Sequence, residues 1–519
     1  MMDRRTWVTV LVMLGVFIAW ERFYMEPRRQ AALTQTAATT QPQGTASSSG
    51  LTTAPVATTP VVEKSVVIDL GTSQLEVSNR SKLFKTWKLT NYREALSADA
   101  RTVDMLTVGH QLDGLGDLVF DRPEYLYLSQ VSGEIQEFAD RIVWSYEDAN
   151  VKIIREYFKP SAGAHTVDVK IAVDFKANPA GNMFVSLTAE SKSEDADLID
   201  RRLVYSSEKG FASADLKGTI DQSAIPFPMK WIGVTNRYFL ISLLKDDGAT
   251  TSGLVQGLAE NKGRVMMVYP VQQGHVQAEL KAFFGPKQLG LLRKVDASLE
   301  STIDFGWFTL FAYPLLRFMK ILNDLVSNWG VAIILLTLAV KLLTFPLTYK
   351  SMKSMKQMAK LNPQIQKLRE RYADDKEALN REMMLLMRNQ GYNPVAGCLP
   401  ILIQMPVFFA LYRVLYSSTE LYQAPFMFWI HDLSAKDPFY ITPAILTAVM
   451  FIQQKLTPNT ASDPMQAKML QWMPVMFGVF MLQLPSGLTL YMLVNALAGI
   501  FQQMLLNKKL DQGHAATAT

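Results

Sequence analysis

Four polar side chains fall on one face of an apolar segment in the second half of the chain. They are Thr337, Lys341, Thr344 and Thr348. Their spacing of i, i+4, i+7 and i+11 aligns them on one side of a helix. A lysine at mid-bilayer depth costs about 2.5–3.5 kcal/mol on insertion scales. Lys341 could reach toward the membrane surface through its flexible stem, but the continuous polar stripe favours a water-filled cavity.

Neutral polar side chains also interrupt the later apolar runs. They are Gln404, Gln471, Gln483, Asn495 and Gln502. Proton and cation relays in membranes normally use buried Asp or Glu. A lone cation among amides and hydroxyls therefore indicates a hydrated cavity that receives a negatively charged or polar group. We find no motif for a metal site, a nucleophile or a phosphate loop, so we expect no enzyme activity, metal or cofactor.

Apolar runs near the length of a membrane helix, about 20 residues, must position these groups. Five of them cover residues 329–349, 395–416, 439–456, 469–484 and 488–506. A sixth run follows Arg4 and Arg5 near the N-terminus. It lacks a small-x-small cleavage pattern, which favours an uncleaved anchor over residues 1–26 rather than a signal peptide. The sequence thus predicts a polytopic α-helical membrane protein with six transmembrane helices.

Loop charges predict how these helices cross the membrane. The 350–394 loop is rich in Lys and Arg, the 417–438 loop is mainly acidic, and the tail at 507–519 carries Lys508 and Lys509 near its start. Basic loops remain in the cytoplasm. Both termini are therefore expected in the cytoplasm and residues 65–298 outside it. The net charge is +5, and the basic residues cluster in loops beside the apolar runs. We interpret them as signals of membrane topology, so we expect no direct nucleic-acid recognition.

The long segment between the anchor and the second span is polar. Residues 27–64 are rich in Thr, Ala, Ser and Pro and predict a flexible tether. Residues 65–298 alternate with period two, as in "HTVDVKIAVDF" at 165–175, which predicts a β-sandwich of antiparallel sheets. A scaffold is favoured over a binding domain. Residues 305–328 predict an amphipathic helix in the membrane interface; a surface helix of the sandwich is the alternative.

The basic 350–394 loop contains residues that typically mark the starts of two helices. Asn362–Pro363 is a helix-start signal, and Asp374 is expected to cap a second helix. Facing apolar stripes then predict an antiparallel hairpin. Met383, Met384 and Met387 add adaptable apolar side chains. This hairpin is either a receiving surface for varied apolar segments or simply a packed pair of helices.

Several stretches resemble the YidC/Oxa/Alb family of membrane protein insertases. They are "GCLPILIQMPVFFALYRVL" at 397–415, "APFMFWIHDLSAKDPFYI" at 424–441, "PMQAKMLQWMPVMFGVF" at 464–480 and "PSGLTLYMLVN" at 485–495. The similarity covers about residues 305–510. The anchor, tether and β domain match the Gram-negative branch in order and size.

The resemblance implies an insertase and chaperone of the bacterial inner membrane. Such proteins insert and help fold nascent membrane proteins, alone or with the Sec translocon. The five spans within 395–506 and 329–349 would enclose a hydrophilic groove that is open to cytoplasm and lipid, and the β domain would be periplasmic. Ribosomes, the signal recognition machinery and membrane lipids are further expected partners. The expected groove residues are Lys341, Thr337, Thr344, Gln404, Met405, Tyr491 and Asn495.

The sequence departs from the family pattern in places. Lys341 stands where arginine is usual, so the charge is kept but the bidentate fork is lost. Met492 replaces an expected aromatic residue, and the tail holds only Lys508 and Lys509 as basic residues, which puts ribosome docking in doubt. A small-molecule transporter using the same cavity is the main alternative, disfavoured because the spans show no internal repeat. A purely structural assembly factor is the third possibility.

Overall fold

The computed structural model describes the backbone of residues 62–515, except for residues 95, 97–98, 107–114, 161–164, 178–180, 191–200, 217–219, 246–251, 304, 373–374, 390–394 and 458–463. Side chains are described for the same residues, except 307, 358–360, 362, 376, 380, 387–389, 395–403, 464–470 and 508–515. The predicted anchor at 1–26 and the tether up to residue 61 lie outside this part of the chain.

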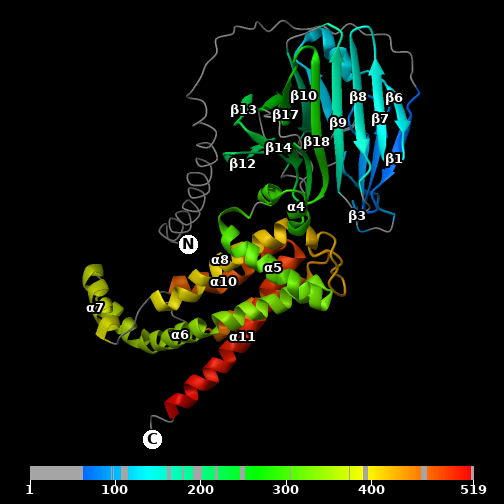
Figure 1. Cartoon of the computed structure of the whole chain (residues 1–519). Helices are drawn as coiled ribbons and strands as arrows, with labels where there is room; N and C mark the ends of the chain where they lie inside the picture. The colour runs from blue at the N-terminus through cyan, green and yellow to red at the C-terminus, as the bar shows by residue number, and fades with distance from the viewer. Residues whose placement is uncertain are drawn as a thin grey trace. The chain divides into compact units, whose positions relative to one another are not determined.

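A β domain comes first (Figure 1). Its strands are β1 (Ser65–Asp69), β2 (Ser73–Ser78), β3 (Thr86–Arg93), β4 (Thr102–Asp104), β5 (Asp117–Phe120), β6 (Glu134–Glu137), β7 (Arg141–Glu147), β8 (Val151–Phe158), β9 (Thr166–Phe175), β10 (Asn182–Glu190), β11 (Arg202–Ser207), β12 (Gly210–Asp215), β13 (Ser223–Ile225), β14 (Met229–Thr235), β15 (Phe239–Lys245), β16 (Ser252–Ala259), β17 (Lys262–Pro270) and β18 (His275–Pro286). A short 3-10 helix, η2 (Pro123–Ser129), follows β5.

The strands form three antiparallel sheets. The largest has nine strands in the order β12-β11-β14-β15-β18-β9-β8-β7-β6, and a five-stranded sheet has the order β13-β16-β17-β10-β5. A small sheet joins β1 to β4 in sequence order. The two larger sheets contact each other through β11 and β14 on one side and β10 and β17 on the other. The prediction of an antiparallel, β-rich domain is confirmed.

The period-two pattern explains how this core forms. Along β9 the apolar side chains at alternate positions from Val167 to Val173 are at most 1% exposed, while Asp168 and Asp174 face outward. Successive side chains of a strand point to opposite faces. One face of β9 is therefore buried in the core of the β domain.

A second apolar cluster connects the β domain to the helices. It begins with Trp231 on β14, continues through Leu292 on α4 and Leu316 on α5, and ends in the membrane helices at residues such as Leu336. The linking elements are α4 (Leu289–Val295), η4 (Ala297–Thr302), η5 (Gly306–Phe308) and α5 (Thr309–Val326). Helix α5 covers most of the predicted amphipathic segment 305–328.

The helices that follow differ in length from the predicted apolar runs. They are α6 (Trp329–Arg371), α7 (Lys376–Asn389), α8 (Val395–Ser417), α9 (Ile441–Leu456), α10 (Pro464–Met481) and α11 (Ser486–Ala515), with the 3-10 turn η6 (Thr419–Leu421) after α8. Among the described residues, Trp329–Gln357 and Ser486–Asn507 are long and apolar enough to cross a membrane. Ile441–Leu456 and Gln471–Met481 are shorter apolar helices.

Helix α6 corrects the predicted start of the hairpin. It runs without a break for 43 residues, so Asn362 does not begin a new helix. Pro363 lies inside it, although an internal proline removes one backbone hydrogen bond. Leu361 and Ile365, on either side of this proline, are 7% and 1% exposed, and their burial favours the continuous helix.

The second helix of this loop starts one residue later than predicted. The carboxylate of Asp375 accepts hydrogen bonds from the backbone N–H groups of Glu377 and Ala378, at 3.1 and 2.9 Å, and Asp374 lies outside the described residues. This satisfies N–H groups that the first turn of α7 leaves without helical partners.

The tight contact between β14 and β15 gives a stability test. A Cβ added to Gly233 would lie 2.6 Å from the carbonyl oxygen of Ile241 on the paired strand. We expect Gly233→Val to destabilise the β domain by roughly 1–3 kcal/mol, because overpacking forces the strands apart. The loss of stability is measured by thermal unfolding of the full chain, with limited proteolysis as the readout of the unfolded fraction. Lys230→Ala, at an exposed position of β14, is the control, and equal melting of both variants would contradict the prediction.

Candidate functional site

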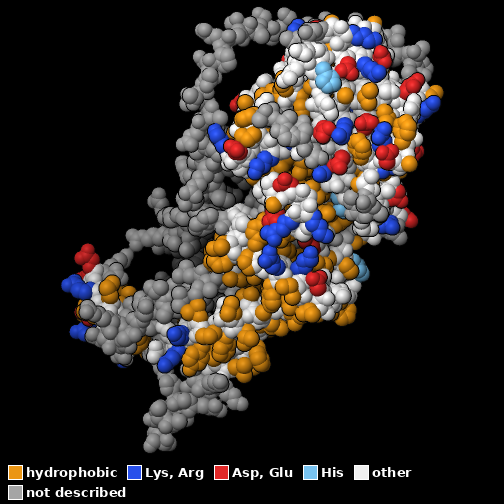
Figure 2. Space-filling view, viewed as in Figure 1, with side chains coloured by type: hydrophobic (Ala, Val, Ile, Leu, Met, Phe, Trp, Pro, Cys, Tyr) orange, Lys and Arg blue, Asp and Glu red, His pale blue; other side chains and the backbone are white. Residues whose placement is uncertain are grey.

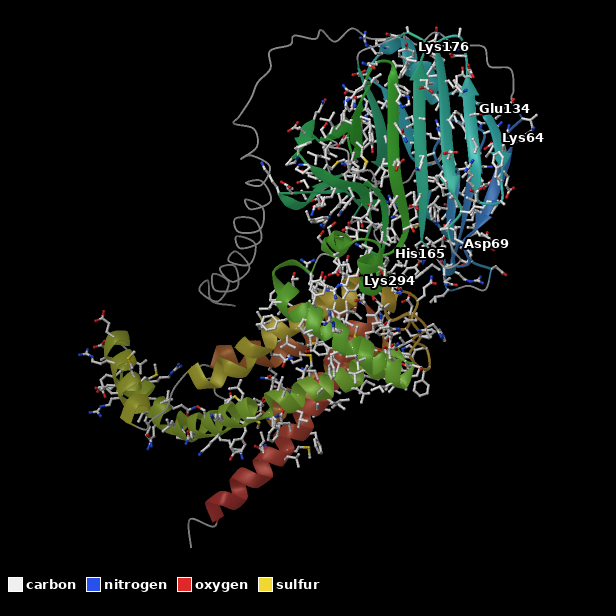
Figure 3. The ribbon with its side chains drawn as sticks, viewed as in Figure 1. Lys64, Asp69, Glu134, His165, Lys176 and Lys294 are labelled. Carbon is white, nitrogen blue, oxygen red and sulfur yellow. The ribbon has the colours of Figure 1, made fainter. Side chains whose placement is uncertain are left out.

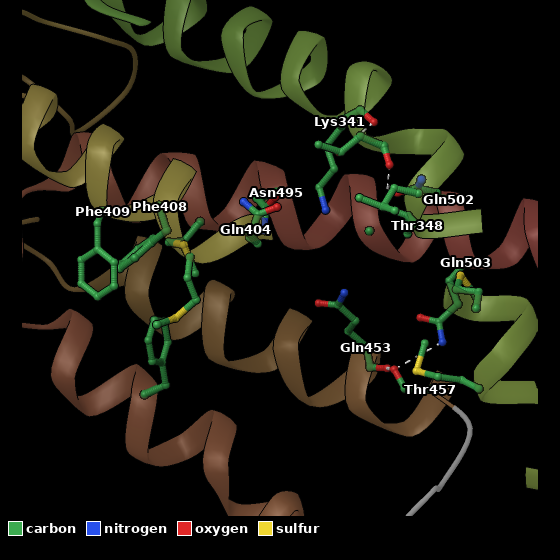
Figure 4. Close-up of a pocket in the computed structure, with 18 residues that line it drawn as sticks. Lys341, Thr348, Gln404, Phe408, Phe409, Gln453, Thr457, Asn495, Gln502 and Gln503 are labelled. Atoms are coloured by element: carbon green, nitrogen blue, oxygen red, sulfur yellow. Dashed lines mark hydrogen bonds between the residues drawn. The ribbon is translucent and has the colours of Figure 1, made fainter. Parts of the chain in front are cut away.

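A cavity of about 530 Å³ lies among the membrane helices (Figure 4). Helix α6 lines it with Lys341, Thr344, Leu347, Thr348, Met352 and Met355, and α8 with Gln404, Met405, Phe408 and Phe409. Helices α9, α10 and α11 add Gln453, Thr457, Phe477, Met492, Asn495, Gly499, Gln502 and Gln503. We call this cavity the polar groove.

Lys341 is the charged centre of the polar groove. Its amine points into the cavity, with Gln453 and Asn495 on neighbouring helices (Figure 4). The described lining contains no Asp or Glu, and the structure describes no ion pair for the amine. A methyl group built on Gly499 would lie 2.7 Å from the Gln453 amide nitrogen and 3.8 Å from the Lys341 amine. The missing side chain at Gly499 therefore leaves space beside the cation.

The threonines of the stripe hydrogen-bond to their own helix. The hydroxyl of Thr344 donates to the carbonyl of Val340 at 2.9 Å, and that of Thr348 donates to the carbonyl of Thr344 at 3.1 Å. Each hydroxyl proton is thus hydrogen-bonded to the backbone carbonyl four residues earlier in the same helix. The oxygen lone pairs are left to accept hydrogen bonds from water or a ligand in the polar groove.

Amide side chains line the facing walls. Gln404 donates to the hydroxyl of Tyr491 at 2.7 Å, and Gln503 donates to the hydroxyl of Thr457 at 3.3 Å. The amide nitrogen of Gln502 is buried and has no hydrogen-bond partner among the described residues. A buried amide without a partner costs free energy, so this nitrogen favours water or a ligand group in the polar groove.

Five of the seven expected groove residues line the cavity. They are Lys341, Thr344, Gln404, Met405 and Asn495. Thr337 and Tyr491 are not among its described lining residues, and each is 1% exposed. Thr337 lies one turn beyond Lys341, and its hydroxyl donates to the carbonyl of Ile333 at 2.6 Å. The buried hydroxyl of Tyr491 instead accepts the hydrogen bond from the side-chain amide of Gln404, which does line the cavity.

Of the other polar residues expected within the apolar runs, one lines the polar groove and two lie elsewhere. Gln502 lines the polar groove, whereas Gln483 accepts a hydrogen bond from Lys436 in the loop before α9 at 2.9 Å. Gln471 lies on an exposed face of α10. The sequence analysis missed Gln453, Thr457 and Gln503. The i, i+4 spacing of Gln453 and Thr457 at the end of an apolar helix is the signal that marks this pair.

The end of the helix bundle beyond Thr337 is closed by a hydrogen-bonded loop. The hydroxyl of Ser486, at the start of α11, donates to the carbonyl oxygens of Asp432 and Ala435 at 2.7 and 2.9 Å. The backbone N–H of Gly487 donates to the carbonyl of Leu433 at 2.9 Å. We call residues 432–437 together with the 484–487 turn the outer seal.

Asp437 anchors the outer seal to α9. Its carboxylate accepts hydrogen bonds from the backbone N–H groups of Thr442 at 2.7 Å and Phe439 at 3.0 Å. Burial alone would raise the pKa of Asp437, but hydrogen bonds from Thr442, Phe439 and Trp429 outweigh burial and hold this pKa below its ordinary value. The carboxylate is thus ionised at neutral pH and keeps the turn before α9 in place.

The expected hairpin methionines lie on α7. Met384 is 69% exposed and Met383 is half-buried. The side chain of Met387 lies outside the described residues. At least Met384 therefore presents an adaptable apolar surface to its surroundings.

Family comparisons cover both halves of the chain. The family described as 60Kd inner membrane protein matches residues 321–513, and the YidC periplasmic domain matches residues 65–318. A membrane protein insertase YidC from Geobacter metallireducens is 30% identical over 99% of this chain and 100% of its own length. The one from Nitratidesulfovibrio vulgaris is 37% identical over 82% of this chain and 83% of its own.

A crystal structure described as an active YidC insertase with the first transmembrane domain resolved also matches. It aligns with 85% of this chain and 92% of its own, with 22% identity and a TM-score of 0.37. The two sequence relatives match over most of their length, and the two family matches adjoin along this chain. The chain therefore belongs to the YidC family of membrane protein insertases.

Proposed function

We propose that this protein inserts hydrophobic segments of nascent membrane proteins into the inner membrane and helps them fold. The observation that carries this proposal is a cation-bearing polar groove, sealed at one end, in a chain of the YidC family. Lys341 lies about 18 Å along α6 from its start at Trp329, at about 1.5 Å per residue. The hydrocarbon core is about 30 Å thick, so the polar groove reaches roughly to its middle.

The groove lowers the barrier for the polar flank of a client. Such a flank cannot cross bare hydrocarbon cheaply, because its polar groups lose water. A wet groove shortens the apolar distance that remains. Lys341 attracts acidic or polar groups of the flank. The side-chain oxygens of the threonines and glutamines accept hydrogen bonds from the N–H groups of the flank. The client's apolar helix then moves sideways into lipid, which is favoured by about 0.8 kcal/mol per buried CH₂.

For the whole chain we propose six spans, with both termini cytoplasmic and the β domain periplasmic. Alternating loop charge supports this arrangement. It places the outer seal on the periplasmic side and opens the polar groove to the cytoplasm and lipid. The 329–349 and 395–506 helices form the insertase core, and α5 lies along the periplasmic membrane surface.

We propose that α7 and the distal part of α6 receive clients before the groove does. The exposure of Met384 supports this role. Nascent membrane proteins are the primary partners. The Sec translocon, the ribosome and the signal recognition machinery are further partners that the family resemblance suggests. The two relatives described above carry the name insertase, which favours insertion over small-molecule transport.

The charge of Lys341 gives the sharpest test. We expect Lys341→Arg to keep insertion, because the positive charge remains. Lys341→Leu should lose clients with acidic translocated flanks first, and Lys341→Glu should be worst because it repels them. Reconstituted insertion of a client series, with acids stepwise neutralised at matched insertase levels, measures this. For strongly acidic clients the loss should be at least about tenfold, or about 1.4 kcal/mol.

Two controls separate charge from folding. Neutral clients should be inserted equally by all four proteins, since a fold defect would reduce every client alike. Thr457→Val keeps the charge of the polar groove and should preserve the preference for acidic clients. Equal insertion of acidic clients by the wild type, Lys341→Leu and Lys341→Glu would reject the role of Lys341.

Topology and groove hydration are tested by cysteine labelling. Cys398 is first replaced by serine, and single cysteines are placed at Thr348, Thr337 and Ala435. A membrane-impermeant maleimide should label position 348 from the cytoplasmic side and 435 from the periplasmic side. Position 337 should stay unlabelled from both sides, because Thr337 is 1% exposed. Labelling of 348 only from the periplasm would reverse the proposed orientation.

The order of client contact is tested with a photo-crosslinker. Placed at Met384, it should capture shorter nascent chains than one placed at Thr348, because α7 meets the client first. Ribosome-bound chains of increasing length provide the series. A crosslinker at Lys230, on the β domain, is the negative control. Capture at 348 before 384 would remove α7 from the receiving role.

A further inference from the structure

A second pocket, which shares no lining residue with the polar groove, lies between α4, η4 and α5. It has a volume of about 390 Å³ and is lined by Arg293, Glu300, Tyr313, Pro314, Arg317, Phe318 and Ile321. This volume lies within the range of small-ligand sites. We call it the α5 pocket.

Part of the lining of the α5 pocket is cationic. Arg293 pairs with Glu300, where one of its N–H groups lies 3.0 Å from a carboxylate oxygen. Arg317 is exposed on α5 and has no ion-pair partner among the described residues. The two guanidinium groups outnumber the one carboxylate, so the pocket carries a net positive charge.

Further basic side chains extend this charge. Lys294 is the next residue on α4 (Figure 3), and the amine of Lys320 lies 3.8 Å from a methyl group built on Gly290 of the same helix. Figure 2 shows Lys and Arg side chains gathered over the region of α4 and α5. Such a cluster raises the local concentration of anions.

Other lining residues of the α5 pocket are apolar, and they continue into an exposed apolar strip on α5. Pro314, Phe318, Ile321 and Leu325 are spaced at i, i+4, i+7 and i+11 on α5, which places them on one face. Phe318, Ile321 and Leu325 are 40%, 51% and 75% exposed. An apolar strip on a helix with basic residues beside it is typical of a helix that lies in the membrane interface.

We propose that the α5 pocket binds the headgroup of an anionic membrane phospholipid. The phosphodiester lies between the guanidinium groups of Arg293 and Arg317, whose forked donors match phosphate oxygens. The acyl chains run along Phe318, Ile321 and Leu325. An inorganic phosphate would use only the cationic half, so the continuous apolar strip favours a lipid as the occupant. The bound lipid fixes α5, and with it the start of α6, at the membrane surface.

Native mass spectrometry of the full chain in a neutral detergent tests this site. Phosphatidylglycerol is the anionic probe and phosphatidylcholine the neutral one. We expect one tightly retained phosphatidylglycerol in the wild type and about tenfold weaker retention in Arg317→Gln, since one charge-assisted contact is lost. Arg317→Lys should be intermediate. Arg381→Gln, at an exposed arginine of α7, is the matched control and should retain the lipid like the wild type.

A second variant tests the apolar half. Ile321→Asn changes a half-exposed side chain and should weaken phosphatidylglycerol retention without reducing the melting temperature. Equal retention by the wild type and Arg317→Gln would overturn the proposal, as would equal retention of phosphatidylcholine. Displacement of the lipid by inorganic phosphate at equal concentration would show an anion site without lipid selectivity, and would overturn the lipid assignment.

Discussion

The rest of the helical domain depends on one constraint: an ammonium group within hydrocarbon needs water or a counter-charge. Lys341 has no acid beside it in the described lining, so the surrounding helices must leave room for water. Gly499 provides that room by lacking a side chain, and the amides of Gln404, Gln453 and Asn495 provide polar walls. Because these groups come from α8, α9 and α11, the cation on α6 limits how closely these four helices can pack.

The same helices converge at the other end, and this contrast gives the groove its direction. Leu336 and Thr337, within two turns of Lys341 on α6, and Tyr491 on α11 are each 1% exposed. Above them, Ser486 and Gly487 hold the loop before α9 through backbone carbonyls. A cavity lined by polar side chains and a tightly packed end therefore occur on the same helices. The difference follows from residue size and polarity, because apolar side chains and self-satisfied hydroxyls fill one end while amides and a cation line the other.

Local patterns in the sequence predicted the features that are local in the structure. Alternation at Val167–Val173 predicted a strand with one buried face, and the stripe from Lys341 to Thr348 predicted a polar helix face. Depth along that face was not predictable: Thr337 shares it but is covered by neighbouring helices. The partnership of Gln503 with Thr457 was also hidden, because it joins α11 to α9. The prediction that a new helix starts at Asn362 was wrong, because the burial of Leu361 and Ile365 outweighs the cost of an internal proline. The resemblance, carried by motifs in 397–495, predicted the family, which periodicity alone could not do.

The outer seal has a consequence for the energy supply of the cell. On α6 the described lining of the polar groove begins at Lys341, and Leu336 and Thr337 on the seal side of it are each 1% exposed, so a layer of packed side chains stands between the groove and the outer seal. A protein with an open pore would let protons and sodium ions leak down their electrochemical gradients whenever it was idle. A groove with one blind end lowers the barrier for a polypeptide flank while the membrane potential is preserved, worth about 2.3 kcal/mol per charge at 100 mV. That potential also pulls acidic flanks toward the positive outer side, so the blind end preserves the force that helps to move them.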